Sequence, residues 1–240
     1  MADSALPFDG SGLSIVVPIY NEGPIITAVL TELRTCLPQA EIVAVDDGSD
    51  DETWDRIRAL PSVRGLRLLR HCGQSAAIYW GLNSATKSLL GIMDGDGQND
   101  PADFGTLVRA LGDGRADVAC GFRVNRHDSW NRRIASRFAN VIRRLILRDG
   151  VRDTGCSQKV FMREHGQLLV PFRGMHRYLP AIFRRAGLRV IEVPVNHRPR
   201  LGGASKYDNW QRARAGICDL FGVAWLLNRK VLPPPTEAAP

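Results

Sequence analysis

The chain lacks the sequence features of a disulfide-bonded, zinc-binding or membrane-spanning protein. Its five cysteines are scattered and odd in number, and none forms a CxxC motif or a Cys/His pair with metal-site spacing. The N-terminal sequence MADSALPFDGSG is acidic and has no apolar signal-peptide core. The apolar run at 220–227 is shorter than the roughly 20 residues that cross a bilayer. We therefore expect a cytoplasmic protein with reduced thiols, a flexible segment over 1–12 and a disordered tail over 231–240.

Charge is distributed unevenly along the 240 residues. Residues 1–120 carry 9 Lys and Arg against 17 Asp and Glu, or −8, whereas residues 121–240 carry 23 against 8, or +15. A basic second half predicts an anionic partner, such as nucleic acid, a diphosphate or a phospholipid surface. A solvated arginine-rich face is the alternative.

Short apolar runs alternate with helical patterns in the first half. Strands are expected at 13–17 (ended by Pro18), 41–45, 66–69, 89–93 and 118–120, with helices at 22–36, 51–60, 74–86 and 101–111. Such alternation predicts an α/β fold with a mostly parallel central sheet and helices on both faces. The second half is less regular, with helices expected at 130–148 and 209–228. The 130–148 helix has an apolar stripe that includes Leu145, and its arginines face either an anionic membrane or water.

Polar clusters follow three of the predicted strands, at 20–22, 46–47 and 94–100. Because ligands of parallel sheets bind at the carboxyl ends of the strands, these clusters should converge on one rim. Asp94 and Asp96 can share a hard divalent cation, and Gln98 can add an amide oxygen. A polar turn or a calcium loop is the alternative, although Gly105 stands where an EF-hand requires Glu.

The Asp46–Asp47 pair also allows two interpretations. Acidic side chains at this position can accept hydrogen bonds from a ribose or a base edge. Alternatively, the segment caps the following helix, for which Ser49 and Asp50 are suitable residues.

The ordered set VVPIYNE, VDDGSDDET, MDGDGQNDP, GFR and GGASKY resembles family 2 glycosyltransferases. It is most similar to their dolichyl-phosphate mannose synthase and bacterial polyprenyl-phosphate glycosyltransferase branch. The resemblance covers about residues 13–208 and implies the GT-A nucleotide-sugar-binding fold. It implies a domain over 13–207, with a donor half at 13–123 and an acceptor half at 124–207. A C-terminal amphipathic helix at 208–230, which can contact a membrane, would follow.

The resemblance also implies roles for individual residues. The base and ribose would be held by Pro18, Tyr20, Glu22, Val45 and Asp47, with Asp94 and Gly95 also lining the nucleotide site. Mg²⁺ or Mn²⁺ would be bound by Asp96 and Gln98, beside Asp94. The donor phosphates would be held by Arg123, Arg200 and Lys206. The catalytic residues among these would be Asp96, Arg123 and Lys206.

A lipid phosphate acceptor is already an anion, so it needs no strong general base, and transfer would proceed by one inverting displacement. His176 and His197 are the two histidines considered as bases, and each reads more simply as an ordinary surface or core histidine. The acceptor residues implied by position are Asp153, Ser157 and His197, with Asp153 either orienting an arginine or capping a turn. Relatives often carry Gly-Phe-Arg where this chain has Ser157-Gln158-Lys159, a departure within the acceptor site.

The expected partners are a nucleotide sugar, a polyprenyl phosphate and the cytoplasmic face of an inner membrane, contacted peripherally. A glycosyltransferase with a soluble saccharide or protein acceptor would share nearly every donor-site residue. A nucleic-acid-binding protein is disfavoured, because the basic half lacks interleaved aromatic residues and the acidic rim repels phosphate. A Rossmann dehydrogenase is disfavoured, because no GxGxxG motif follows the first strand.

Overall fold

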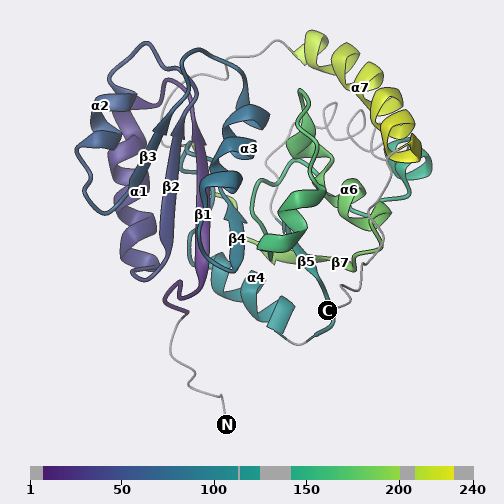
Figure 1. Cartoon of the computed structure of the whole chain (residues 1–240), viewed down its shortest axis with the longest axis horizontal. Helices are drawn as coiled ribbons and strands as arrows, with labels where there is room; N and C mark the ends of the chain where they lie inside the picture. The colour runs from purple at the N-terminus through teal and green to yellow at the C-terminus, as the bar shows by residue number, and fades with distance from the viewer. Residues whose placement is uncertain (1–7, 113, 125–141, 201–208, 230–240) are drawn as a thin grey trace, which may run out of the picture.

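The computed structural model describes residues 8–112, 114–124, 142–200 and 209–229, with side chains of the last helix described from residue 218. These residues form one seven-stranded sheet with helices on both faces (Figure 1). The strands are β1 (Leu13–Ile19), β2 (Glu41–Asp46), β3 (Arg64–Arg67), β4 (Leu89–Ile92), β5 (Val118–Arg123), β6 (Lys159–Met162) and β7 (Val190–Val195). The helices are α1 (Gly23–Cys36), α2 (Thr53–Arg58), α3 (Gln74–Ser84), α4 (Asp103–Gly112), α6 (Leu179–Arg185) and α7 (Asn209–Arg229), with 3₁₀ helices η1 (Arg163–Leu168) and η2 (Met175–Arg177).

The strand order is β3-β2-β1-β4-β6-β5-β7, and every neighbouring pair is parallel except those that include β6. The predicted fold class is therefore confirmed. The parallel strands β1, β2 and β4 end at the same edge of the sheet, so the three polar clusters do converge on one rim.

Successive side chains of the central strands point to opposite faces of the sheet and pack into two separate hydrophobic cores. In β1, Ile15 and Val17 face the core formed with α1, α2 and α4, whereas Val16 faces the core formed with α3, α6 and α7. Hydrophobic side chains on both faces explain why the predicted strands are nearly continuous apolar runs.

Two strand boundaries differ from the prediction. β1 continues through Pro18 to Ile19, because β4 pairs with β1 only as far as Val16 and leaves one side of the strand free at the proline. β3 is an edge strand that begins at Arg64 and ends at Arg67, and the predicted strand residue Leu69 is fully exposed.

Residues 8–12 were expected to belong to a flexible segment, but they contact the domain. The Gln39 N–H donates a hydrogen bond to the Asp9 carbonyl at 2.9 Å, and Phe8 packs against the α1-side core. Residues 1–7 and the predicted tail over 231–240 lie outside the described residues.

Most of the predicted helix at 130–148 also lies outside the described residues, which show a helix only at 142–147. In that part the predicted apolar stripe holds for Ile142, which packs against the core formed with α3, α6 and α7, but not for Leu145. Leu145 is 72% exposed, whereas Arg143 is buried because the Asp149 carboxylate lies 3.2 Å from its guanidinium. The ion pair with the buried Asp149 carboxylate thus accounts for an arginine in the interior of this segment.

At Gly81 α3 packs tightly against β1, so Gly81→Ala should destabilise the fold. A Cβ added there would lie 2.3 Å from Val16 Cγ1, so we expect unfolding free energy to fall by about 1–3 kcal/mol, as for an overpacked core. Gly112→Ala is the matched control, because a Cβ at this helical glycine meets nothing within 4 Å. It should be neutral or stabilising by about 0.5 kcal/mol. Urea unfolding of both variants measures the difference, and equal midpoints would contradict this account of the packing.

Candidate functional site

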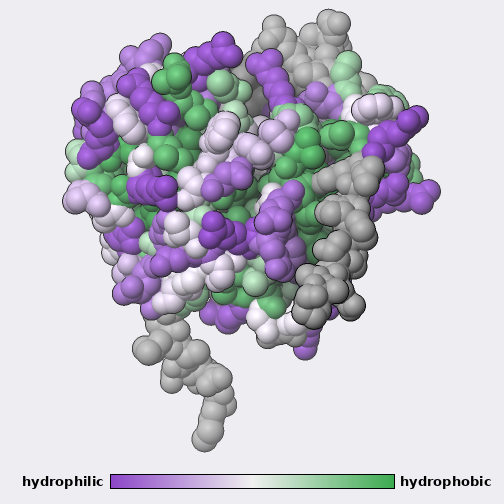
Figure 2. Space-filling model, viewed as in Figure 1, coloured by the Kyte–Doolittle hydropathy of each residue, from purple (hydrophilic) through white to green (hydrophobic). Residues whose placement is uncertain are grey.

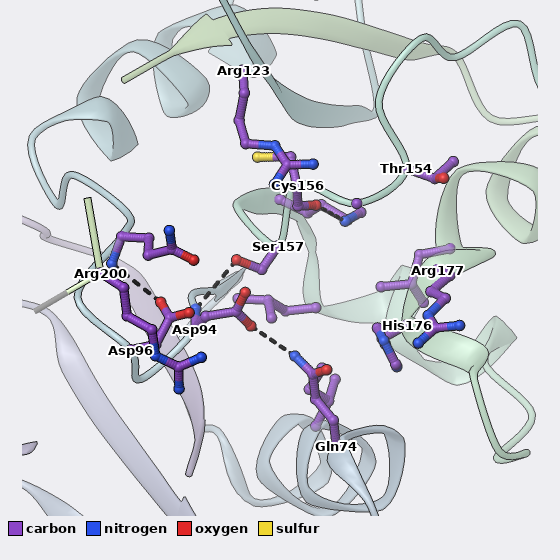
Figure 3. A pocket seen from close by; sticks show the side chains of 16 residues that line it. Gln74, Asp94, Asp96, Arg123, Thr154, Cys156, Ser157, His176, Arg177 and Arg200 are labelled. Atoms are coloured by element: carbon purple, nitrogen blue, oxygen red, sulfur yellow. Dashed lines mark hydrogen bonds between the residues drawn. The ribbon is translucent and has the colours of Figure 1, made fainter. Parts of the chain in front are cut away.

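A pocket of about 620 Å³ lies at the carboxyl ends of the central strands and combines residues from both halves of the chain (Figure 3). One wall is the loop that follows β4, which we call the acidic loop (residues 94–100). The opposite wall is η2 together with Thr154, and Arg123 and Cys156 lie between the two walls. The pocket therefore sets the acidic rim of the first half against basic side chains of the second half.

The acidic loop places two carboxylates beside each other. Gln74, the first residue of α3, donates a hydrogen bond to Asp94 Oδ1 at 2.7 Å, and Asp96 Oδ1 accepts the Gln98 N–H at 3.1 Å. Burial, and then the neighbouring Asp96 carboxylate, raise the pKa of Asp94 to about 6. Gly95 permits this conformation, because a Cβ there would lie 3.0 Å from a side-chain atom of Ile19.

The composition of this loop suits a hard divalent cation. Two neighbouring carboxylates, Asp94 and Asp96, line the pocket, and a cation between them would offset their mutual repulsion. The Gln98 amide nitrogen donates to the Arg198 carbonyl at 3.4 Å, which leaves the amide oxygen as a third oxygen donor. Within the described residues there is no group of three or more His, Cys, Asp or Glu placed to hold a metal ion. The protein could thus provide part of a coordination shell, to be completed by ligand or water oxygens.

Two predicted phosphate-binding arginines line the pocket, and each contacts a carboxylate. Arg123 Nε and Nη2 donate to the two Asp153 oxygens at 2.7 and 2.9 Å, while Arg200 forms an ion pair with Glu22. Asp153 also accepts the Gly155 N–H at 3.1 Å, so it both orients an arginine and closes a turn. The third predicted phosphate ligand, Lys206, lies outside the described residues.

The predicted base-binding residues lie beside this pocket, at the ends of β1 and β2. Tyr20 stacks on His71 with ring centroids 4.0 Å apart. Asp47 accepts the N–H groups of Cys72 and Gly73, both at 2.8 Å, and its Oδ2 lies 2.9 Å from His71 Nδ1. The Val45 side chain is buried in the core against α3, so it does not reach this edge. Pro18 is buried within β1.

The capping interpretation of the segment after β2 is wrong for Ser49 and Asp50. The N-cap position of α2 is Glu52, and the helix begins at Thr53. The Ser49 N–H donates to Asp46 Oδ1 at 3.0 Å, and its Oγ accepts the Asn21 N–H at 2.9 Å. Ser49 thus ties the end of β2 to the end of β1.

The predicted acceptor residues Ser157 and His197 both contact the acidic loop. Ser157 Oγ accepts the Asp94 N–H at 3.3 Å and donates to Asn99 Oδ1 at 2.8 Å. His197 pairs with Asn99 in an isolated β-bridge, and its Nε2 lies 3.5 Å from Gln98 Nε2. These contacts make Ser157 a support of the acidic loop.

Several residues that line the pocket could not be identified from sequence motifs. Lys159 is almost fully buried in β6 and donates to the Cys156 carbonyl. Gln74 and Arg177 belong to no motif, and His176 was considered as a base but interpreted as an ordinary surface or core histidine. The lining residues without an assigned role include Gln74, Thr154, Lys159, His176 and Arg177. The sequence drew attention to two of them, Lys159 through the departure at 157–159 and His176 as a candidate base.

Residues 14–168 match the family model described as Glycosyl transferase family 2. The chain belongs to this family. It is 34% identical over 241 residues to dodecaprenyl-phosphate galacturonate synthase of Rhizobium johnstonii, covering 95% of this chain and 70% of the relative. It is 32% identical over 204 residues to undecaprenyl-phosphate 4-deoxy-4-formamido-L-arabinose transferase of Aeromonas hydrophila, covering 81% of this chain and 62% of that relative.

Solved structures of glycosyltransferases share the fold of this family 2 member, which is GT-A. Glucosyl-3-phosphoglycerate synthase from Mycobacterium tuberculosis, in complex with Mn²⁺ and UDP-glucose, superposes with a TM-score of 0.69 at 20% identity. The match covers 90% of this chain and 79% of that one. The mannosyltransferase PcManGT from Pyrobaculum calidifontis, in complex with GDP-Man and Mn²⁺, gives 0.65 at 21% identity, covering 96% and 69%. Among the described helices, none is both long and apolar enough to span a bilayer.

Proposed function

We propose that this family 2 glycosyltransferase moves a sugar from a nucleotide-sugar donor to a polyprenyl phosphate, with Mg²⁺ or Mn²⁺ as cofactor. The observation that carries the proposal is the pocket in which the carboxylates of the acidic loop face cationic side chains of the second half. A donor diphosphate and an acceptor phosphate are both anions, so a site for both needs this mixture of charges. The two relatives described above are named for transfer to dodecaprenyl and undecaprenyl phosphate.

The donor lies across the carboxyl ends of β1, β2 and β4 in this proposal. Tyr20 and Asp47 hold the base and ribose, since one is an aromatic platform and the other a hydrogen-bond acceptor at the same strand ends. Arg123, Arg200 and Lys206 hold the diphosphate. The ion pair between Arg200 and Glu22 keeps the segment at 197–200 against the donor side of the pocket.

The cofactor fits the acidic loop, with Asp94, Asp96 and Gln98 as the protein ligands. A bound Mg²⁺ or Mn²⁺ would act as a Lewis acid that neutralises charge on the departing diphosphate. Gln74 and Ser157 keep the loop in shape, because one binds the Asp94 carboxylate and the other its N–H.

The transfer step is a single displacement at the anomeric carbon. A phosphate oxygen of the acceptor forms the new C–O bond as the C–O bond to the donor's β-phosphate breaks, and the configuration inverts. The nucleoside diphosphate leaves with the bonding electron pair. Because the nucleophile is already ionised, the residues need only to position two anions and offset their repulsion.

A transfer assay tests the proposal. Purified protein is mixed with Mn²⁺ or Mg²⁺, labelled UDP- and GDP-sugars, and undecaprenyl phosphate in detergent. The expected result is label in the organic phase that depends on the metal and on one donor. Transfer of label only to a water-soluble saccharide or protein would replace the lipid acceptor by a soluble one. A folded protein that binds no nucleotide sugar would contradict the enzymatic proposal as a whole.

We further propose that α7 attaches the enzyme peripherally to the cytoplasmic face of an inner membrane. Leu220, Val223 and Leu227 are buried against the core, whereas Phe221 and Trp225 are 61% and 63% exposed one helical turn apart. The Arg229 guanidinium lies 6.0 Å from the centre of the Trp225 ring. Exposed aromatics beside a basic residue suit the boundary between headgroups and acyl chains. Figure 2 shows that hydrophobic and hydrophilic residues are intermixed on the face viewed there.

Replacing both Phe221 and Trp225 with serine should weaken binding to vesicles that contain anionic lipid by about tenfold or more, because two large apolar side chains no longer insert. Vesicle co-sedimentation measures the partition coefficient. Trp80→Ser is the matched control, because Trp80 is 57% exposed but lies on α3. Equal losses in the two variants would contradict attachment through α7.

A further inference from the structure

The wall of the pocket opposite the acidic loop has no assigned role. It is formed by η2, whose His176 and Arg177 line the pocket across from Asp94 and Asp96 (Figure 3). η2 begins after Gly174, which has a left-handed backbone (φ 90°) that turns the chain sharply into the pocket. His176 and Arg177 are thus consecutive basic residues on one short 3₁₀ helix.

Arg177 differs from the other arginines of the pocket in its charge balance. Arg123 is bound by Asp153, and Arg200 by Glu22. In the part of the chain that the structure describes, no carboxylate lies within 4.0 Å of the Arg177 guanidinium. A partly buried guanidinium without a carboxylate partner has hydrogen-bond donors available for an anionic ligand.

His176 is held in place from α3. The Gly174 N–H donates to Ser75 Oγ at 3.1 Å, and the same oxygen lies 2.8 Å from His176 Nδ1. Ser75 accepts from Gly174 and can donate its hydroxyl proton to Nδ1. In that tautomer the imidazole proton is on Nε2, where it is a donor. Ser75 is buried, so this arrangement is shielded from competing water.

The same turn of α3 organises both walls. Gln74 binds the Asp94 carboxylate, and the next residue, Ser75, binds η2. The first turn of α3 therefore fixes the separation between the acidic loop and η2. A fixed separation suits a displacement reaction in which nucleophile and leaving group are both anions, because the nucleophile must be held in line with the leaving group.

We propose that His176 and Arg177 form the subsite for a phosphomonoester group of the acceptor, and that Ser75 is a positioning residue for His176. This inference rests on the proposed function and assigns one wall of its site. The phosphomonoester is held by the guanidinium and the imidazole N–H while one of its oxygens faces the anomeric carbon. The chemistry is shared by a lipid phosphate and a water-soluble phosphate ester.

The test compares Arg177→Ala and His176→Ala with Arg173→Ala, a control on the same segment whose arginine is exposed and does not line the pocket. With undecaprenyl phosphate as acceptor, we expect the acceptor KM to rise about 10- to 100-fold in Arg177→Ala and about tenfold in His176→Ala, as for a lost charge-assisted hydrogen bond. Arg173→Ala should stay within about twofold. Donor affinity, measured by calorimetry with the nucleotide sugar and Mn²⁺, should be unchanged in all three. Arg177→Lys should recover part of the loss, because it restores the charge without the fork of donors.

Ser75 requires a readout that a merely structural role would not change. Ser75→Ala should raise the acceptor KM several-fold with little change in donor affinity, and Ser75→Thr should restore it by returning the hydroxyl. An equal loss of donor and acceptor affinity in Ser75→Ala, without rescue by threonine, would overturn the positioning role.

A binding experiment separates this inference from the proposed function. A short-chain prenyl phosphate and 3-phosphoglycerate are titrated into the protein with nucleoside diphosphate and Mn²⁺ present. Weaker binding of either probe by Arg177→Ala than by the wild type supports the subsite, and the probe affected tells a lipid acceptor from a soluble one. Equal binding of both probes by both proteins overturns the subsite, even where wild-type transfer to lipid succeeds. Failed transfer by a wild type that binds a probe through Arg177 contradicts the proposed reaction and leaves the subsite supported.

Discussion

Asp96→Ala is expected to abolish sugar transfer while the protein remains folded. The Asp96 carboxylate lines the pocket, and the hydrogen bond it makes within the acidic loop is to the Gln98 N–H. Removing it takes away one of the two carboxylates proposed to bind the cation, so a loss of about 10³-fold or more in kcat/KM is expected. The unfolding free energy should change by less than about 1 kcal/mol, since the side chain is outside both hydrophobic cores.

Metal binding and a control variant test whether the loss of transfer in Asp96→Ala comes from loss of the cation. Binding of Mn²⁺ in the presence of nucleoside diphosphate, followed by calorimetry, should be lost together with transfer. Asp50→Ala removes the same charge from an exposed position that does not line the pocket, and it should leave both properties unchanged. An Asp96→Ala enzyme with full activity would remove the acidic loop from the catalytic site.

The donor side of the site could be anticipated from the sequence, because its residues follow consecutive parallel strands. Asp47 follows β2 and Asp94 follows β4, and parallel pairing through β1 forces both to the same edge. Hydrophobic patterning fixes such strands locally, so the rim follows from the order of the elements.

The opposite wall could not be anticipated in this way. β6 is antiparallel and inserts between β4 and β5, so Ile92 pairs with Lys159 across 67 residues of chain. His176 meets Ser75 across 101 residues. No local pattern in the sequence encodes contacts between residues so far apart along the chain. The histidine and arginine of η2 therefore resemble surface residues until the sheet brings them to the pocket.

Breaking the ion pair between Arg123 and Asp153 is the second change expected to have a large effect. Both side chains are mostly buried, with 18% and 8% exposure, and two N–H···O bonds join them. Asp153→Ala leaves a mostly buried guanidinium without its carboxylate, so unfolding free energy should fall by about 3 kcal/mol. Transfer should also fall sharply, because Arg123 is then free to leave its position in the pocket. Urea unfolding and the transfer assay measure the two effects.

A double variant separates the structural role of this pair from its chemical role. Arg123→Met combined with Asp153→Asn removes both charges, keeps a side chain of similar length at 123 and retains an amide oxygen for the Gly155 N–H. Stability should recover most of the loss, since no buried charge is left unpaired. Transfer should remain low if the Arg123 guanidinium contacts phosphate during the reaction, as we propose. A double variant that regains both stability and transfer would show that Arg123 serves only to satisfy Asp153, and the phosphate-binding charge would then have to come from Arg200, Lys206 and the η2 wall.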